Sequence, residues 1–295
     1  MKKKLNLVIK ILVSIVLFWI IFRSIDLKIL IGNFSNFQPI YAVLIVLCLV
    51  LNYVVSSIRW KGLLIHEGGN KVSVWYLTRL YFVGSFFNNF LPTSIGGDVY
   101  KIYKLGKKIG STSDSFAATF MERFTGVISL MLISLVSLWK YLSYWSVVLT
   151  IGFLLLFVLG LYVLRFLSTK HSIFSKLYGS FSLYRAEKKV LGFALVTSFV
   201  VQFLSVFTQY FVFRALGLDV PFIYALVVLP MITLAGFFIP SLNSMGVQDA
   251  LYIQVFSYVG VGRELAFTAS ILYHFFRLVV SLVGGVFYVF EENNR

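Results

Sequence analysis

The residues most able to do chemistry in this sequence are ionisable side chains in or beside long apolar segments. Asp98 and Asp249 each end an interruption of such a segment, and Arg123 and Arg277 follow them by 25 and 28 residues. Glu122 immediately precedes Arg123. Arginine binds phosphate through paired hydrogen bonds, which lysine cannot do. These residue types at this spacing predict a polar site for an anionic, phosphate-bearing amphiphile.

Both aspartates close a stretch in which proline and glycine break an apolar run. The first stretch is Phe86-Phe87-Asn88-Asn89-Phe90-Leu91-Pro92-Thr93-Ser94-Ile95-Gly96-Gly97-Asp98, and the second is Phe238-Ile239-Pro240-Ser241-Leu242-Asn243-Ser244-Met245-Gly246-Val247-Gln248-Asp249. Pro92 removes a backbone donor and disfavours helix at the residue before it, while Gly96 and Gly97 permit positive φ. Freed N–H groups at helix ends and glycine turns bind anions. Paired interruptions in two halves of a chain indicate a transporter's binding site.

We expect side chains around the two interruptions to line one central polar cavity. The predicted substrate-binding residues are Arg79, Asn88, Asn89, Ser94, Gly96, Gly97, Asp98, Lys101, Glu122 and Arg123 in the first half, and Asn243, Ser244, Gly246, Asp249 and Arg277 in the second. No catalytic residue, metal ligand or cofactor is predicted, because the three histidines, His66, His171 and His274, are scattered along the chain.

Structural roles are the alternative for the acidic residues. Asp98 could cap a helix that begins at Val99, and Asp249 is in a similar position, since aspartate stabilises the positive end of a helix. Glu122 and Arg123 are about 100° apart on a helix and should therefore pair with different groups. A structural ion pair that holds the two halves together is the alternative to ligand contact for both.

The remaining basic residues have alternatives of their own. His274 is one turn from Arg277 and is interpreted as a satisfied core histidine rather than a proton carrier. Lys101 and Lys104 are one turn apart and are expected to face lipid headgroups. Arg79 could point into the predicted cavity.

The composition places these groups in a membrane protein. Of 295 residues, 59% are hydrophobic and 13% are charged, and the mean hydropathy is +0.91. Soluble domains contain roughly 25% charged residues. The single cysteine, Cys48, cannot form an intrachain disulfide. Lys2 to Lys4 lead into an apolar run without a small-residue cleavage site, so we expect the first segment to stay as an anchor.

Apolar segments recur along the whole chain. They fall at about 5–22, 39–58, 75–91, 114–138, 146–166, 190–213, 222–240 and 265–289, with a shorter helix near 247–259. We predict an all-α polytopic membrane protein with about six to eight transmembrane helices in a single membrane domain. Its halves, 1–140 and 141–290, are expected to form an inverted repeat, each with one re-entrant or broken helical hairpin. The alternative is an eight-span count in which either hairpin crosses fully.

The net charge of +15 is interpreted as a topology signal. Basic clusters occur at Lys2 to Lys4, at Arg59, Lys61 and Lys71, at Lys101, Lys104, Lys107 and Lys108, and at Arg165, Lys170, Lys176, Arg185, Lys188 and Lys189. All can be cytoplasmic only if 75–98 enters and leaves on one side. We expect a plasma (inner) membrane protein with both termini cytoplasmic. Attraction to anionic headgroups is a compatible interpretation, whereas nucleic-acid binding has no motif behind it.

The motifs resemble the flippase-like family that includes the transmembrane region of lysylphosphatidylglycerol synthase. The resemblance covers nearly the whole chain and rests on Asn89-Phe90-Leu91-Pro92 with Gly96-Gly97-Asp98, on Glu122-Arg123-Phe124-x-Gly126, on Pro240-Ser241 through Gly246-Val247 and Asp249, and on Arg277 with Gly284-Gly285. Lys101 stands where the family more often has arginine, and Asp249 where members usually have glutamate. The resemblance implies lipid translocation, with phospholipids or polyprenyl-phosphate-linked lipids as substrates.

We therefore predict a flippase or scramblase for a phosphate-bearing lipid and no enzyme activity. No nucleotide-binding loop of the Walker type is present, so any drive would be an ion gradient or the lipid gradient itself. The alternatives are a membrane enzyme acting on lipid phosphates and a non-transporting scaffold for a cytoplasmic or membrane transferase. Homo-oligomerisation stays open.

Overall fold

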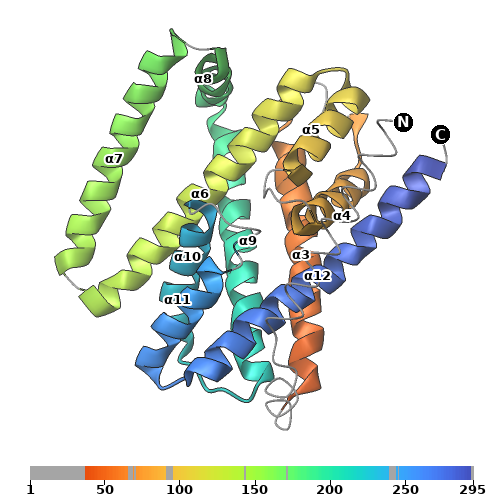
Figure 1. Ribbon diagram of the computed structural model, residues 1–295. Coiled ribbons are helices and arrows are strands. Elements are labelled where there is room, and N and C mark those ends of the chain that lie inside the picture. The colour runs from red at the N-terminus through yellow and green to blue at the C-terminus, as the bar shows by residue number, and fades with distance from the viewer. Residues whose placement is uncertain are drawn as a thin grey trace.

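The computed structural model describes residues 37–65, 69, 71–90, 96–142, 144–170, 172–238, 244 and 246–293, and its regular elements over these ranges are helical (Figure 1). The helices are α3 (Pro39–Gly62), α4 (Val74–Phe90), α5 (Gly96–Ile109), α6 (Thr112–Leu142), α7 (Tyr144–Ser168), α8 (Ser172–Arg185), α9 (Lys188–Ala215), α10 (Phe222–Phe238), α11 (Val247–Phe256), the short η3 (Ser257–Val259) and α12 (Arg263–Asn293). The predicted all-α class is confirmed. The segment 5–22 and the site candidates Ser94 and Asn243 lie outside the described residues.

Four of the described helices contain stretches long and apolar enough to cross a membrane. They are Pro39–Gly62, Thr112–Val136, Lys188–Ala215 and Arg263–Phe290. About 20 helical residues cover the roughly 30 Å hydrocarbon core. The helix α7 has 25 residues and an apolar sequence. The chain is therefore a multi-pass membrane protein.

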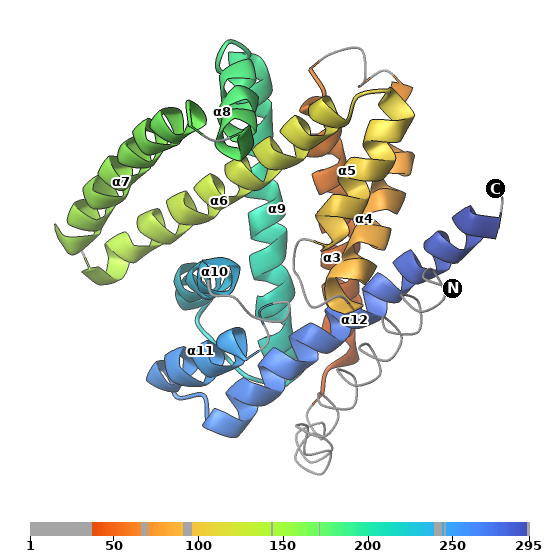
Figure 2. The ribbon, with the colours of Figure 1, turned by 45° about the horizontal axis from the view of Figure 1, so that its top comes forward.

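Two helices near the middle of the molecule, α3 and α9, form a central pair on which other helices pack. The helices α3 and α9 pack along each other, and both views show α6 and α12 crossing this pair obliquely (Figures 1 and 2). The helix α4 packs on α3, α5 and α12, whereas α10 packs on α9, α11 and α6. The helix α7 packs on α6 and α8. Each short pair, α4 with α5 and α10 with α11, thus lies against both the central pair and a long oblique helix.

The buried apolar side chains form two clusters. One surrounds Phe213, Tyr252 and Phe256, where α9, α10, α11 and α12 meet. The other surrounds Trp60 and Leu105 between α3, α4, α5 and α6. The polar sites described below lie beside these clusters.

Glycines allow the closest helix contacts. A Cβ at Gly97 would lie 2.0 Å from the carbonyl oxygen of Gly84, so α5 begins directly against the backbone of α4. A Cβ at Gly284 would lie 2.0 Å from the carbonyl oxygen of Phe82, so α12 touches the same helix from another side. Any larger residue at either glycine would have to push these helices apart.

Two helix boundaries differ from the alternatives considered for the sequence. The helix after the first interruption begins at Gly96 rather than Val99, which places Asp98 in its first turn instead of at its cap. The interval 165–189, which holds the last basic cluster of the sequence, contains the 14-residue helix α8. Its serines and its glycine interrupt the apolar residues. Tyr184 donates a hydrogen bond to the carbonyl of Leu63, the residue after α3, at 2.5 Å.

Candidate functional site: a buried five-charge cluster

Five ionisable side chains from three helices meet beside the start of α5. We call this the five-charge cluster: Arg59 of α3, Asp98 and Lys101 of α5, and Glu122 and Arg123 of α6. Four of the five were predicted as site residues. Their charges are connected without a break, because each cation contacts a carboxylate and each carboxylate contacts two cations.

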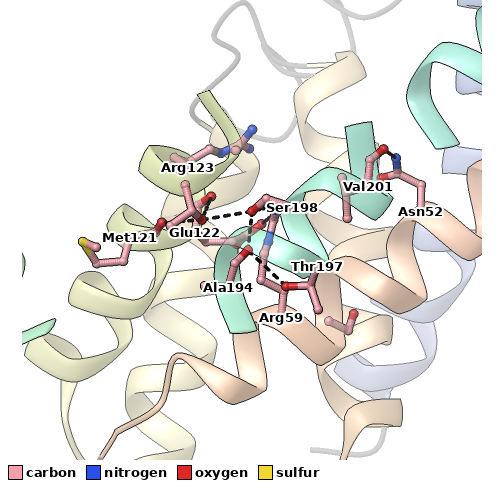
Figure 3. A network of polar contacts seen from close by, with 12 residues as sticks. Asn52, Arg59, Met121, Glu122, Arg123, Ala194, Thr197, Ser198 and Val201 are labelled. Carbon is pink, nitrogen blue, oxygen red and sulfur yellow. Dashed lines mark hydrogen bonds and ion pairs between the residues drawn. The ribbon is translucent and has the colours of Figure 1, made fainter. Parts of the chain in front are cut away.

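One pair of the cluster is sealed from the surroundings. Arg59 Nη2 lies 2.7 Å from Glu122 Oε1, and the two side chains are 6% and 3% exposed. Arg59 Nη1 also donates to Ser198 Oγ at 2.9 Å, and Ser198 donates to Thr125 Oγ1 at 3.1 Å. Figure 3 shows Arg59, Glu122 and Ser198 converging from α3, α6 and α9. This pair joins three long helices and fits the structural role left open for Glu122.

The second pair is open on one side. Arg123 donates from Nε and Nη2 to the two carboxylate oxygens of Asp98, each at 2.9 Å. Asp98 is 13% exposed, but the Arg123 side chain is 45% exposed. Glu122 and Arg123 thus pair with different groups, as predicted. The two-pronged geometry is the one by which a guanidinium also binds phosphate.

Lys101 lies between the two pairs. Its Nζ is 3.3 Å from Asp98 Oδ1 and 3.5 Å from Glu122 Oε2, and its side chain is only 2% exposed. The ammonium also lies 3.9 Å from the ring centre of Tyr81 and 4.9 Å from that of Trp60. The expectation that Lys101 faces headgroups was wrong, because aromatic rings and carboxylates replace water around its charge.

The cluster carries more positive than negative charge. Arg59, Lys101 and Arg123 share the two carboxylates of Asp98 and Glu122, so the described residues leave one positive charge in excess. Buried charges are costly unless they are paired. The excess favours an additional anion, and the half-exposed Arg123 is the member an anion can reach.

A second polar group lies between α11 and α12. Asp249, in the first turn of α11, accepts hydrogen bonds from Ser270 Oγ at 2.6 Å and from the backbone N–H of Gly246 at 2.8 Å. His274 Nε2 lies 3.3 Å from Asp249 Oδ1. His274 is buried, as expected of a core histidine, and its polar neighbour is this carboxylate. The guanidinium of Arg277 lies 5.3 Å from the ring centre of Tyr273.

The other predicted residues have varied positions. Asn88 accepts a hydrogen bond from the N–H of Gly97 at 2.8 Å and so holds the start of α5 to α4. Arg79 stacks on Phe287 of α12, with 5.4 Å between Cζ and the ring centre. Ser244, at φ 68°, donates to the carbonyl of Gly236 at 3.0 Å.

The candidates therefore do not form one site among the described residues. Asp98, Lys101, Glu122 and Arg123 come together beside Gly96 and Gly97, whereas Asp249 and Gly246 lie in the separate group between α11 and α12. Asn89 lies on α4, one residue before the end of the helix.

Sequence reasoning missed Arg59 and undervalued His274. Arg59 was assigned to the cytoplasmic basic residues because it stands three residues from the end of α3. Its position one turn inside an apolar helix could have indicated burial. His274 follows Asp249 by 25 residues, the same spacing that separates Asp98 from Arg123, and this equality could have marked it as the partner.

A metal site finds no support in the part of the chain that the structure describes. No group of three or more histidine, cysteine, aspartate or glutamate side chains there is placed to hold a metal ion. The arrangement instead combines a guanidinium, an ammonium and helix N-termini, which are groups that bind anions.

The fold and these polar groups define a multi-pass helical membrane protein with a buried charge network at the start of a short helix. The chain belongs to the family described as "Lysylphosphatidylglycerol synthase TM region", whose match covers residues 7–285. The resemblance inferred from the motifs is confirmed. The family is defined by a membrane region, and its description names the synthase in which that region occurs.

Two relatives come from archaea. A UPF0104 membrane protein of Methanothermobacter thermautotrophicus is 24% identical over 273 aligned residues, covering 80% of each chain. A UPF0104 membrane protein of Pyrococcus horikoshii is 24% identical over 329 aligned positions, covering 97% of this chain and 96% of the relative. Their names describe membrane proteins and state no catalytic activity. No solved structure matches.

Proposed function

We propose that this protein is a flippase or scramblase that moves a phosphate-bearing lipid across the bilayer. The lipid phosphate binds at Arg123 in the five-charge cluster, while the acyl or prenyl chains remain in the membrane. The observation that carries this proposal is the excess positive charge of the cluster, combined with the 45% exposure of Arg123. An anionic headgroup would balance that charge at the accessible end of the network.

The contacts also suggest how Arg123 can exchange Asp98 for a lipid phosphate without leaving a buried charge unpaired. When a phosphate draws Arg123 away, Asp98 would lose its main partner, and an unpaired buried carboxylate is costly. Lys101 Nζ, already 3.3 Å from Asp98, can keep that carboxylate paired. Glu122 retains Arg59 at 2.7 Å throughout. Lys101 therefore makes the Asp98–Arg123 pair displaceable without unbalancing the rest.

An inverted repeat with two re-entrant hairpins is part of the proposal. It is supported by the matching order of the helices, since a short pair, α4 with α5 or α10 with α11, is followed in each half by a long helix, α6 or α12. It is also supported by matching neighbours, since α4 packs on α12 and α10 packs on α6. The repeat halves, 1–140 and 141–290, would then present their short helices from opposite sides of the membrane.

The orientation we propose has both termini in the cytoplasm of a plasma (inner) membrane. Exposed basic residues support it, because they gather where α5, α7 and α8 end and where α9 begins. They are Lys107, Lys108, Arg165, Lys170, Arg185, Lys188 and Lys189. The opposite ends of α9 and α12 carry mixed charges, Arg214 with Asp219 and Arg263 beside Glu264. Loops rich in lysine and arginine stay in the cytoplasm.

The test measures lipid movement in proteoliposomes. A fluorescent phosphatidylglycerol in both leaflets is bleached from outside by a membrane-impermeant reductant, and the lipids that copurify with the protein are identified by mass spectrometry. Arg123→Ala should slow movement roughly tenfold or more, because a charge-assisted contact of about 1.5–3 kcal/mol is lost. Arg277→Ala tests the second half in the same way. Arg185→Ala, at an exposed position on α8, is the matched control.

The results for the two arginine variants decide whether the protein transports a phosphate-bearing lipid. One phosphate-bearing lipid enriched with the wild type and lost from Arg123→Ala supports transport of that lipid. Unchanged lipid movement in Arg123→Ala and Arg277→Ala would count against it.

A scaffold role for a cytoplasmic transferase is the second candidate. It draws on the exposed basic residues at the end of α8 and the start of α9, Arg185, Lys188 and Lys189, which could dock an acidic partner. Replacing these three by glutamate should abolish partner capture by the tagged membrane protein if this is their role. If the glutamate variant still captures the partner and still moves lipid, these basic residues do not dock a partner and serve only to set the membrane topology.

A further inference from the structure

The group between α11 and α12 has the geometry of a switchable counterpart to the Asp98–Arg123 pair. Asp249 stands in the first turn of α11 as Asp98 stands in the first turn of α5. His274 follows Asp249 by 25 residues, and Arg123 follows Asp98 by 25. Each partner lies on the next long helix, α12 or α6. The imidazole therefore occupies the place that a guanidinium occupies in the first half.

The chemical difference between these partners is whether the cation is permanent. A guanidinium stays protonated in proteins, whereas an imidazole carries charge only after it takes up a proton. The Asp98–Arg123 pair is thus always an ion pair. The Asp249–His274 pair becomes one only when a proton is bound.

The surroundings of His274 leave room for that proton. The side chain is 7% exposed, and neither ring nitrogen makes a hydrogen bond of standard geometry to any described residue. Asp249, by contrast, is held on both oxygens, by Ser270 and by the N–H of Gly246. The carboxylate is fixed, and the imidazole beside it has a free nitrogen to accept a proton.

The other ionisable groups nearby are few among the described residues. Arg277 on α12 is a permanent cation, and Tyr273 and Tyr252 are phenols, neutral at physiological pH. The Tyr252 hydroxyl is occupied, since it donates to Gln209 of α9 at 2.8 Å. His274 and Asp249 are therefore the groups here whose joint charge can change near neutral pH.

We propose that His274, paired with Asp249, is a proton-binding site that couples lipid movement to a proton gradient. This inference rests on the proposed transport function. A proton from the aqueous side adds to the free imidazole nitrogen, and the imidazolium forms an ion pair with Asp249 that ties α11 to α12. Release of the proton to the other side returns a neutral imidazole and loosens the two helices.

The first experiment reads proton binding without requiring transport. Isotope-labelled histidine is observed by NMR in nanodiscs, in a background of His66→Asn and His171→Asn that leaves His274 alone. We expect its signals to change between about pH 5 and pH 8, the range in which imidazoles titrate. A single charge state over that whole range would overturn the proposal.

The second experiment measures lipid movement as a function of pH with two substitutions at one position. The wild-type rate should change about tenfold across the range in which imidazole charge changes. His274→Arg places a permanent cation beside Asp249, as Arg123 is beside Asp98, and its rate should equal the wild-type rate at low pH at every pH. His274→Gln is always neutral, and its rate should equal the wild-type rate at high pH at every pH. Replacing His66 and His171 by asparagine controls for the other histidines.

The outcomes keep this inference apart from the proposed function. Lipid movement that is insensitive to pH, or that stays pH-dependent in His274→Gln, overturns the proton site and leaves the flippase proposal standing. An imidazole that titrates in a protein that moves no lipid overturns the coupling and the flippase proposal together.

Discussion

At the scale of single residues, the five-charge cluster contains one ion pair that holds helices together and another that is accessible to a ligand. The Arg59–Glu122 pair is sealed among α3, α6 and α9. The Asp98–Arg123 pair is open on the arginine side. The attraction within a buried ion pair is offset by the cost of removing both charges from water, whereas removing one partner leaves an uncompensated buried charge. The sealed pair fixes the helices, and the open pair is available to a ligand.

Lys101 should behave unlike an ordinary buried ion-pair residue when it is removed. In Lys101→Met, the remaining charges are balanced as Arg59 with Glu122 and Arg123 with Asp98, so we expect a melting temperature equal to or above that of the wild type. Lipid movement should nevertheless fall about tenfold, because Asp98 would be left unpaired when Arg123 turns to the phosphate. Thermal melting in detergent and the lipid-movement assay are measured on the same preparation.

The comparison variants are Arg59→Met and Lys101→Arg. Arg59→Met leaves Glu122 without its closest partner and should destabilise the protein by about 3–5 kcal/mol, the cost of breaking a buried pair. Lys101→Arg keeps the charge and should retain transport. A Lys101→Met protein that melts far below the wild type would show that the lysine is structural.

At the scale of elements, the start of the short helix α5 is built by close contact with the backbone of α4. The N–H of Gly97 is bound by Asn88 of α4, and the carbonyl of Gly84 occupies the space a side chain at 97 would need. This contact sets the position of Asp98, the next residue. The geometry of the cluster therefore depends on a glycine that carries no functional group.

Replacing Gly97 by alanine should move α5 away from α4. The added Cβ would meet backbone rather than a movable side chain, so we expect destabilisation of about 1–3 kcal/mol, typical of overpacking. Weaker lipid binding should follow as Asp98 shifts. The matched control is Gly192→Ala in α9, where a Cβ meets nothing within 4 Å. Thermal melting of both variants gives the comparison, and equal melting temperatures would contradict it.

The sequence predicted most of these elements and part of the site. Long apolar runs placed α3, α6, α9, α10 and α12 within a few residues, because burial in lipid demands uniform hydrophobicity. Charges in apolar segments marked Asp98 and Arg123 as site residues, but their pairing with each other was not predicted and is seen only in the structure. Arg59 was missed because a basic residue near a helix end is also typical of a cytoplasmic boundary. Only the packing of α3 on α9 shows that its charge points inward.

At the scale of the whole molecule, the polar groups lie toward opposite ends of the central pair. Arg59 stands three residues from the end of α3, while Asp249 stands in the first turn of α11 and His274 in the first half of α12. In the orientation we propose, the five-charge cluster is nearer the cytoplasm and the histidine group nearer the outside.

Cysteine labelling tests this orientation directly. In a Cys48→Ser background, Asp219→Cys should react with an impermeant maleimide in intact cells, because its side chain is 92% exposed and would face outward. Lys188→Cys, also exposed, should react only after the membrane is permeabilised. The reverse pattern would invert the topology, and labelling of both in intact cells would exclude the arrangement.

The sealed Arg59–Glu122 pair limits which parts of the protein can change conformation. Breaking it would strand a buried charge, so α3, α6 and α9 should move as one rigid body. Any hinge must then lie at the short helices α4, α5, α10 and α11 and at the adjoining part of α12. Distances between spin labels on α3 and α6 should stay constant during turnover, whereas those from either helix to α11 should broaden.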